Sequence, residues 1–533
     1  MPKPELNLVK ADKEQRAAFN GDGQRVIRHD PGKLPEILDE CEQALVETDC
    51  NLFVQSGRLV RIYPAKEGLS FGINRPRGAN TLHPVDGAHQ VELLTKAAIH
   101  QRFDARADEY KPCDCPRRVA DAFLARGNWP HLNQLAGFIE APTITPDGRV
   151  IEQPGYDEDT GLFAAFEQNV RSTSPKPKPS RTDAEKAKLV LMELVDDFPV
   201  VDECDTSAML AGIITSLVRR ILPAAPMMAI TAPTPGTGKT LVAETFAIIA
   251  TGRRASVLSL GHDESEAEKR MGGVLMAGDS CILLDNIERP LKGDLLCQVC
   301  TQQFVRLRPL GASGMVSIPT HALLVATGNN LSIVGDLKRR VVLIRMDAKQ
   351  ERPEQRTFTR DHLETVFERR GELIRAALEI PLAYIAAGSP AINGLHPLGG
   401  FELWDKMVRR PLVWLGMADP LKAAEGLRQQ DPDLEAMRML FESWLAAFPK
   451  GEATAAEIVS ASLSTLGFAE TLTRSYPDLY DAMQMVCAEK INSRRLAYWL
   501  RSHRDRIVDG MRLEQCGMDG HAKIARWKIV KCG

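Results

Sequence analysis

One short glycine-rich segment constrains the fold of this 533-residue chain more than any other feature. Residues 235–240, PGTGKT, lie between the apolar run PMMAITA and the helix-like run TLVAETFAIIA. Further short apolar runs, among them CILLDN and HALLVATGNN, alternate with helix-like segments after it. Because such alternation builds parallel strands that are covered by helices, the sequence predicts an α/β core with a parallel sheet.

The glycine-rich segment has the composition of a phosphate-binding loop. Glycines let backbone N–H groups converge on phosphate oxygens, Lys239 would pair with the β and γ phosphates, and the Thr240 hydroxyl would hold Mg²⁺. The first glycine of the GxxxxGK[ST] pattern is replaced by Pro233, but Gly236 and Gly238 keep the core of the cradle. The structural alternative is a Gly/Pro turn before a surface helix. The predicted nucleotide-binding residues are Pro235, Gly236, Thr237, Gly238, Lys239, Thr240 and Leu241.

Two other apolar runs end in polar side chains that could meet this loop. CILLDN places Asp285 at the end of one predicted strand, and LLVATGNN places Asn329 and Asn330 at the end of another. Ligands of open α/β sheets bind at the edge formed by the carboxyl ends of the strands. We therefore predict that Asp285 and Thr240 hold Mg²⁺. Asn329, with Asn330 as the alternative, would orient the attacking water or touch the γ phosphate.

A pair of arginines closes a short helical segment in GDLKRRVVLIRMD. An arginine that reaches into a neighbouring subunit's site can stabilise the charge on a transferred phosphoryl group. Arg339 and Arg340 are both candidates, and the sequence does not distinguish between them. The structural alternative is a surface or salt-bridged arginine.

Taken in order, these four elements resemble the AAA+ ATPases, and more narrowly the superfamily 3 helicase-like ATPases of bacteriophages and integrating elements. The resemblance covers about residues 185–360 and is carried by APTPGTGKT, CILLDN, TQQFVRLRPLG and LLVATGNNLSIVGDLKRRVVLIRMD. The upstream segment HLNQLAGFIEAPTITPDGRVIEQPGYDEDTG also looks like one found before the ATPase in phage-type replication proteins. The resemblance implies a hexameric ring that uses ATP and Mg²⁺ to translocate on DNA and part its strands.

The chain departs from this family in two places. A second acid, which acts as general base, usually follows the Walker B Asp, whereas this chain has Asn286. Either Glu288 takes that role, or Asp285 and Asn329 position the water without a separate base. The hairpin that grips DNA in this family has here the tip GASGMVSIP, without Lys or Arg. The nearest basic residues, Arg306 and Arg308, are the predicted DNA contacts of this hairpin.

The C-terminal part of the chain is basic although the whole chain has a net charge of −3. Residues 490–533 carry 11 Lys and Arg against 4 Asp and Glu, which suggests a polyanionic partner. Thr454 and Glu457 fit a capping box, a helix is expected from Asn492, and RIVDGMRL and HAKIARWKIV are strand candidates. This order looks like a winged helix, while a solvated basic subdomain is the alternative. The predicted DNA-binding residues are Arg494, Arg495, Arg501, Arg526 and Lys528.

Composition changes along the chain suggest five segments. Alternating Lys and Pro in RSTSPKPKPS favour an extended linker. Before it we expect a hairpin with Ser56-Gly57 at its turn and a helix over residues 117–126. After it we expect a helix over residues 183–197 and a second that starts near Asp205, Thr206 or Ser207. The predicted segments are an α+β N-terminal module (1–170), a linker (171–182), the AAA+ core (183–360), a helical region (361–450) and a winged-helix-like domain (451–533).

No apolar run approaches the roughly 18 residues that a membrane helix needs, and the first residues lack the apolar core of a signal peptide. We therefore expect a cytoplasmic protein that does not enter a membrane. The favoured hypothesis is an ATP-driven DNA helicase or translocase of a phage or mobile element. It would act as a hexamer on single-stranded or forked DNA, with a primase as a further candidate partner. The alternatives are an AAA+ initiator or helicase loader, and a nucleotide-binding scaffold without useful hydrolysis.

Overall fold

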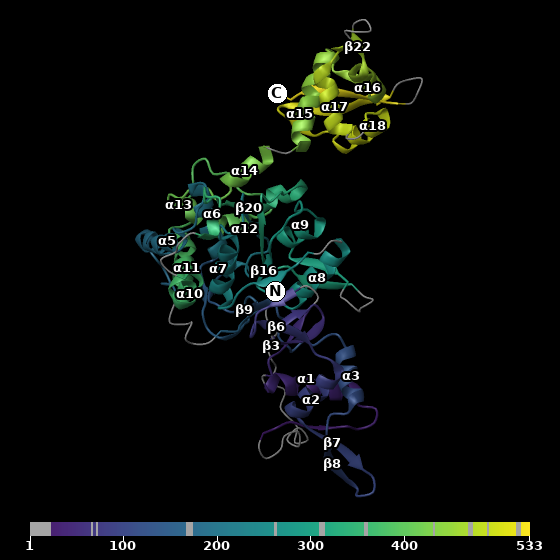
Figure 1. The fold of residues 1–533 in the computed structure, drawn as a ribbon. Helices are drawn as coiled ribbons and strands as arrows, with labels where there is room; N and C mark the ends of the chain where they lie inside the picture. Colours follow the sequence, from purple (N-terminus) through teal and green to yellow (C-terminus); the bar gives the residue numbers. More distant parts are fainter. Residues whose placement is uncertain are drawn as a thin grey trace. The chain divides into compact units, whose positions relative to one another are not determined.

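The computed structural model describes residues 23–48, 50–65, 68–70, 73–166, 174–260, 264–308, 315–355, 361–429, 432–466, 473–487, 490–518 and 524–532. The chain forms two compact units, Met1–Ala424 and Glu425–Gly533 (Figure 1). The predicted five-segment division stays a prediction, and residues 171–173 of its linker lie outside the described residues. In the part of the chain that is described, no helix combines the length and apolar character needed to cross a membrane.

A seven-stranded sheet forms the centre of the first unit. In spatial order its strands are β20 (Val341–Arg345), β14 (Met227–Ala232), β19 (Leu323–Asn329), β16 (Cys281–Leu284), β15 (Ser256–Leu258), β5 (Ile73–Arg75) and β4 (Gly68–Ser70). The first five run parallel, which confirms the predicted parallel sheet of an α/β core. Strand β19 lies between β14 and β16, so the loop after β14 and the end of β16 are separated by one strand.

Helices cover both faces of this sheet, and for this reason its strands are almost entirely apolar. Figure 1 shows α7 (Lys239–Thr251) and α11 (Arg370–Ala386) on one side of the sheet, and α8 (Glu264–Met276) and α9 (Asp294–Thr301) on the other. Every residue of α7 from Val242 to Ala250 is buried. The phosphate-loop candidate is therefore anchored between a buried strand and a buried helix.

Helix α6 (Glu203–Val218) begins earlier than predicted. The predicted start near Asp205 was wrong, because Asp202 is the N-cap and Asp205 lies inside the first turn, where its carboxylate accepts from the Asp202 amide at 3.0 Å. Asp205 also accepts from the Arg345 guanidinium at 2.9 Å and 3.1 Å, which ties α6 to β20. Helix α5 (Arg181–Val195) begins with a capping box between Ser180 and Asp183.

The described residues between 23 and 166 form small sheets and helices, many of them around an apolar cluster of their own. The predicted hairpin is confirmed, with Ser56 (φ +52°) and Gly57 (φ +73°) at its turn. The predicted helix is α3 (Arg117–Ala125). The other elements are β1 (Val26–Arg28), α1 (Leu34–Glu47), β2 (Leu52–Gln55), β3 (Arg58–Pro64), β6 (Asn80–Pro84), α2 (Gly87–Ala97), β7 (Ile99–Asp104), β8 (Glu109–Cys113), β9 (Gly137–Ile139), β10 (Thr143–Ile144), β11 (Val150–Ile151), β12 (Gly155–Asp157) and β13 (Leu162–Ala164).

Part of this N-terminal region is built into the central sheet. Strand β5 pairs antiparallel with β15, and the Arg75 guanidinium of β5 donates to both carboxylate oxygens of Asp279, at 3.0 Å and 2.5 Å. The side chain of Asp279 is only 4% exposed, and it also accepts from the Ser256 hydroxyl at 2.6 Å. Strand β5 is therefore tied to the central sheet by a buried ion pair as well as by its strand pairing.

Replacing Arg75 with alanine is expected to destabilise the first unit by about 3 kcal/mol, because it leaves the buried Asp279 carboxylate without its counter-ion. Urea unfolding of the full chain, followed by tryptophan fluorescence, measures this loss. Arg77→Ala is the control, since Arg77 is exposed and lies two residues further along the chain. Equal unfolding midpoints for the two variants would contradict the assigned role of the ion pair.

Helices follow the central sheet up to the end of the first unit. They are α10 (His362–Glu368), α11, α12 (Glu402–Trp404), α13 (Arg410–Trp414) and α14 (Lys422–Gln429), with a π-helical turn at Asp405–Arg409 between α12 and α13. The Arg370 guanidinium donates to the carbonyls of Ile248 and Ile249, at 2.9 Å and 3.1 Å, and so caps the C-terminus of α7. These helices are thereby tied to the helix that follows the glycine-rich loop.

The second unit combines helices with a four-stranded antiparallel sheet in the order β21-β26-β25-β24. The capping box of Thr454 and Glu457 and the helix start at Asn492 are both confirmed. The elements are α15 (Pro432–Ala447), β21 (Glu452–Thr454), α16 (Ala455–Leu463), β22 (Thr465–Leu466), β23 (Thr473–Arg474), α17 (Pro477–Cys487), α18 (Ser493–Ser502), β24 (Ile507–Val508), β25 (Met511–Met518) and β26 (Ala525–Lys531).

One strand of this unit was predicted wrongly. RIVDGMRL is not a single strand but the hairpin β24–β25, because Asp509 (φ +48°) and Gly510 (φ +71°) adopt the left-handed conformation of a tight turn. The other strand candidate, HAKIARWKIV, contains most of β26, although its residues 521–523 lie outside the described residues. In β26 the buried Trp527 and Ile529 alternate with the partly exposed Arg526 and Lys528. The winged-helix assignment stays a prediction.

Candidate functional site

The glycine-rich loop connects β14 to α7 at the carboxyl edge of the central sheet. Gly236 (φ +76°) and Gly238 (φ +96°) adopt left-handed backbone conformations, which are costly for residues with a Cβ atom. A Cβ at Gly238 would also lie 3.3 Å from Cε1 of Phe198. Gly238 is the N-cap of α7, and the amides of a helix N-terminus form a natural anion site. The two glycines thus produce the local shape that a phosphate group requires.

Lys239 is the first residue of α7, and its ammonium group bridges the loop to the neighbouring strand. Its Nζ donates to Oδ1 of Asn329 at 2.7 Å and to the carbonyl of Thr234 at 3.2 Å. Burial lowers the pKa of Lys239, and the nearby Asp285 carboxylate acts in the opposite direction. Two residues predicted separately, Lys239 and Asn329, are therefore in direct contact.

The predicted metal-binding pair, Thr240 and Asp285, also meets at this edge. The Thr240 hydroxyl donates to Oδ1 of Asp285 at 3.2 Å. The same oxygen accepts from the hydroxyl of Thr327 at 2.5 Å. A hydroxyl and a carboxylate are the oxygen ligands that Mg²⁺ prefers in phosphate-loop sites. The donor set therefore fits a magnesium ion beside the loop.

Thr327 belongs to this site although the sequence reasoning did not select it. It lies on β19, between β14, which leads into the glycine-rich loop, and β16, which ends just before Asp285. Besides its bond to Asp285, its hydroxyl accepts from the amide of Asn286 at 3.0 Å. The signal that could have found it is the two-residue period of a strand, which places Thr327 and Asn329 on the same face of β19. Thr327 positions the Asp285 carboxylate.

Replacing Thr327 with valine is expected to raise the Mg²⁺ concentration for half-maximal ATP hydrolysis about 10-fold, because groups that orient a metal ligand are typically worth 10- to 100-fold. Magnesium titration of steady-state turnover measures the shift. Thr231→Val is the matched control. Thr231 lies on the neighbouring strand β14, and its hydroxyl accepts from the backbone amide of Leu331 at 2.9 Å. A Mg²⁺ dependence equal in both variants would remove Thr327 from the site.

The residues predicted to act on the attacking water are Glu288 and either Asn329 or Asn330, and they differ in their contacts. Asn286 follows Asp285 in the left-handed conformation (φ +53°), and its side-chain amide lies 3.5 Å from Oε1 of Glu288. Within the described residues no hydrogen bond joins Glu288 to Asp285 or Thr240. Asn330 also has a left-handed backbone conformation (φ +46°), and its backbone N–H donates to the carbonyl of Ala232. Asn329, rather than Asn330, is therefore the residue that contacts Lys239.

The two candidate arginines close the 3₁₀ turn Gly335–Arg340 and differ in their surroundings. The Arg340 guanidinium donates to the Cys297 carbonyl at 3.0 Å and to the Thr301 hydroxyl at 2.5 Å, and its side chain is 16% exposed. Arg339 pairs with Asp336 and its side chain is 66% exposed. Arg340 thus holds the turn against α9, whereas Arg339 extends into solvent.

A cavity of about 340 Å³ adjoins the loop on the side of α7. Phe198 links the two, because it packs against Gly238 and also contacts the ring of His362 edge-to-face, with centroids 4.7 Å apart. His362 in turn lies 2.8 Å from the Thr245 hydroxyl of α7. The lining includes Phe198, Leu241, Leu363, Arg254, Asp361 and His362. A cavity of this size, lined by both apolar and polar side chains, can hold a nucleobase.

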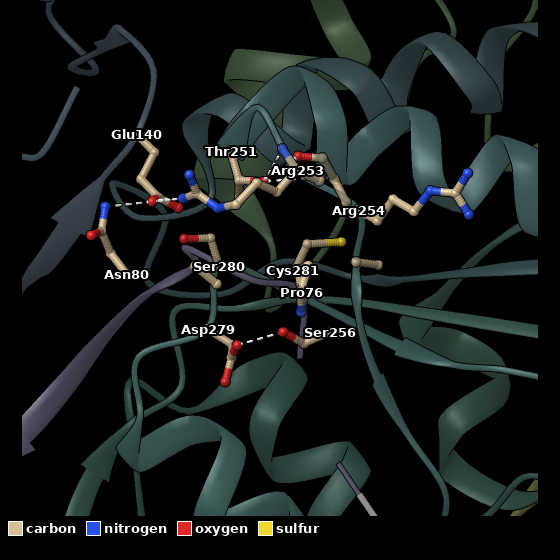
Figure 2. Close-up of a pocket in the computed structure, with 13 residues that line it drawn as sticks. Pro76, Asn80, Glu140, Thr251, Arg253, Arg254, Ser256, Asp279, Ser280 and Cys281 are labelled. Carbon is tan, nitrogen blue, oxygen red and sulfur yellow. Dashed lines mark hydrogen bonds and ion pairs between the residues drawn. The ribbon is translucent and has the colours of Figure 1, made fainter. Parts of the chain in front are cut away.

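A second hollow lies at the opposite edge of the sheet and has a different character. Figure 2 shows Glu140 between Asn80 and Arg253, and Asp279 bonded to Ser256. Its lining includes Arg253 and Asp279, which lie just before β15 and β16, so the hollow adjoins the amino ends of these strands. The enclosed volume of about 20 Å³ is enough for about one water molecule. This hollow is a polar joint between the N-terminal strands and the core, and no nucleotide fits it.

The hairpin β17 (Phe304–Leu307) and β18 (Val316–Pro319) carries the predicted DNA contacts of the first unit. Arg306 and Arg308 are both exposed, and Phe304, on the same face of β17, is 50% exposed. Residues 309–314, which include the first part of the predicted hairpin tip, lie outside the described residues. The structure thus adds an aromatic side chain to the basic pair.

The predicted DNA contacts of the second unit differ in their partners. Arg495 donates to the Cys487 carbonyl at 3.0 Å, and Arg526 and Lys528 form ion pairs with Glu457 and Glu452 at 3.8 Å and 3.4 Å. The exposed face of α18 carries Arg494, Tyr498 and Arg501 at helical spacing. Tyr498 is 73% exposed and was not selected from the sequence. This face of α18 is the better candidate surface.

No family model matches the chain, and no curated protein matches it. Among solved structures, the C-terminal region of NrS-1 is 12% identical, with 84% of this chain and 100% of that chain covered and a TM-score of 0.37. The SCCmec type IV Cch helicase is 11% identical, with 90% and 97% covered and a TM-score of 0.33. The JCV helicase is 13% identical, with 47% and 73% covered and a TM-score of 0.20. At these TM-scores the matches do not establish a common fold, so the site rests on its own geometry.

Proposed function

We propose that this protein is an ATP hydrolase that works as a motor on DNA, most simply as a helicase or translocase. One observation carries the proposal. The Thr240 hydroxyl and the Asp285 carboxylate are within hydrogen-bond distance, and Lys239 lies at the start of the same helix turn. Three side chains that a magnesium–triphosphate complex requires are thereby brought to one edge of the sheet.

Each residue has a role in the proposed reaction. The loop amides and Lys239 hold the triphosphate, while Thr240 and Asp285 hold Mg²⁺, which when bound would neutralise the charge on the phosphate oxygens. Asn329 exchanges its bond to Lys239 for a contact with the γ phosphate or the attacking water. Glu288, two residues after Asn286, accepts the proton of that water.

The cavity beside α7 supports ATP as the nucleotide. Phe198 and Leu241 offer apolar side chains to a base, and Asp361 offers a carboxylate that can accept from an exocyclic amino group, as adenine has. The distance along the chain from Gly238 to Leu241 is one helical turn, so base and phosphates lie at neighbouring positions. Leu241 keeps its predicted place among the nucleotide-binding residues.

The exposed side chain of Arg339 supports a ring-shaped assembly. The predicted number of subunits in this ring is six. The Arg339 side chain lies just before β20, at the amino edge of the parallel sheet and therefore opposite to the glycine-rich loop of its own chain. A site that lacks an arginine of its own is completed when a neighbouring copy supplies one. The basic face of α18 and the hairpin β17–β18 are the proposed DNA contacts, and a primase remains a candidate partner.

A nucleotide-binding scaffold is the second candidate function, and Asn286 favours it. This amide stands where a general base is expected, and the side chain cannot take up a proton as a carboxylate does. An initiator or helicase loader would share the ATP site but would not displace a strand.

Turnover and strand displacement on forked DNA separate these functions. ATP hydrolysis that is stimulated by single-stranded DNA and accompanied by displacement supports the motor. Stimulated hydrolysis without displacement favours the initiator or loader. An assembled ring that binds ATP but shows no turnover favours the scaffold and contradicts the proposed hydrolase.

A further inference from the structure

The N-terminal sheet β2–β3–β6 lies beside the hairpin β17–β18 within the first unit. The amide of Leu82 on β6 donates to the Ala277 carbonyl, at the end of α8, at 2.9 Å. A groove with a volume of about 60 Å³ lies at this junction, against β18. One wall holds Gln55, Ser56 and Arg58, and the other holds Val316, Ser317 and Pro319.

The described residues that line this groove include a positive charge, Arg58. No carboxylate is among the described residues that line it. Arg58 is exposed in one wall. Arg306 does not line the groove but is paired across the hairpin with Ser317 of the other wall, so these two side chains lie on the same face of the hairpin. Within the described ranges, neither arginine uses its side chain in a hydrogen bond or an ion pair. Arg58 in one wall and Arg306 one strand beyond the other are therefore uncompensated cations, and such groups favour an anionic ligand.

The floor and one end of the groove are apolar. Val60, Leu82, Met276 and Ile318 line it. Phe304 is 50% exposed and is paired across the hairpin with Pro319, which lines the groove. Exposed aromatic and apolar side chains next to cations are the combination on which nucleic-acid bases stack while their phosphates are held. An acidic peptide would use the arginines but not the flat apolar surface.

We propose that this groove holds a single strand of nucleic acid, with Arg58 and Arg306 on its phosphates and Phe304 against a base. The inference rests on the proposed function and adds to it, because it makes the N-terminal sheet one wall of the DNA path. Arg58 is the new residue, since nothing in the sequence connected it with Arg306. The groove uses the side of the hairpin rather than its tip.

The test is equilibrium binding of the full chain to a fluorescein-labelled oligothymidylate, measured by anisotropy over a range of salt concentrations and without nucleotide. Arg58→Ala and Arg306→Ala are each expected to weaken binding about 10-fold. Each should also reduce the slope of log K against log salt by about 0.7, the contribution of one phosphate contact on a single strand. Arg106→Ala is the control, because Arg106 is exposed on the turn between β7 and β8, away from the groove.

A gain-of-function variant keeps the test independent of folding defects. Ser317 is exposed in the groove wall, so Ser317→Lys is expected to tighten binding severalfold and to raise the salt slope. If Arg58→Ala binds like Arg106→Ala, or if Ser317→Lys leaves the affinity unchanged, the groove assignment is wrong. Because no nucleotide is present, this result does not depend on the ATPase. A wild-type chain that binds the oligonucleotide but not ATP would instead contradict the proposed function alone.

Discussion

Replacing Lys239 with alanine is expected to lower ATP turnover about 10³-fold, which corresponds to ~4 kcal/mol of transition-state stabilisation. The ammonium group is the side-chain cation at the mouth of the loop, and it already contacts Asn329 across the site. Steady-state turnover at saturating ATP and Mg²⁺ measures the loss. The melting temperature should not fall, because the same burial that lowers the pKa of Lys239 disfavours its charge.

Lys292→Ala is the control for this experiment. Lys292 is exposed and lies a few residues after the end of β16, outside the loop. It should retain wild-type turnover. A Lys239→Ala variant that hydrolyses ATP at the wild-type rate would refute the loop assignment. The melting temperature of the variant shows whether a loss of turnover comes from the missing ammonium group or from unfolding.

Replacing Arg339 with alanine is expected to lower turnover by at least about 10³-fold, the lower end of the range for arginine fingers. Its side chain is exposed and, within the described residues, pairs with the exposed Asp336, so its removal should leave the fold intact. Arg340→Ala should behave differently. It removes the contacts to Cys297 and Thr301 and should lower the melting temperature.

Mixing two inactive variants tests whether Arg339 acts on a neighbouring subunit. Arg339→Ala subunits have an intact loop, and Lys239→Ala subunits have an intact Arg339. Mixed assemblies should therefore regain part of the turnover that neither variant shows alone. If no mixture regains activity while the variants still assemble, Arg339 does not complete the site of another copy.

The parts of the site that the sequence predicted are those encoded by local pattern. A loop with Gly236 and Gly238 between an apolar strand and a helix leaves few conformations, and Lys239 and Thr240 follow from its geometry. Asp285 and Asn329 were predictable because parallel strands bring their carboxyl ends to one edge. Their contact with the loop residues required only that β16 and β19 belong to the same sheet.

The parts that the sequence did not predict depend on distant pairing. Thr327 reads as an ordinary strand residue until β19 is known to lie between β14 and β16. Strands β4 and β5 join the central sheet although more than 150 residues separate them from β15. The Asp509-Gly510 turn was a local signal that the apolar run around it obscured.

The cavity beside α7 and the difference between Arg339 and Arg340 also could not be predicted from patterns in the sequence. Phe198, Leu241 and His362 come together only when α10 packs on α7. Arg339 and Arg340 are adjacent in sequence, and only their burial separates the exposed side chain from the anchored one. Pairwise packing of this kind carries no periodic signature along the chain.

A crystal structure of the chain with Mg²⁺ and a non-hydrolysable ATP analogue tests the central claim most directly. The account predicts a triphosphate against the amides of residues 235–240, and a metal ion about 2.1 Å from the Thr240 hydroxyl with Asp285 in its first or second coordination sphere. The Lys239 ammonium should have left Asn329 for the β and γ phosphates. A triphosphate bound elsewhere, or a metal ion remote from both Thr240 and Asp285, would contradict the account.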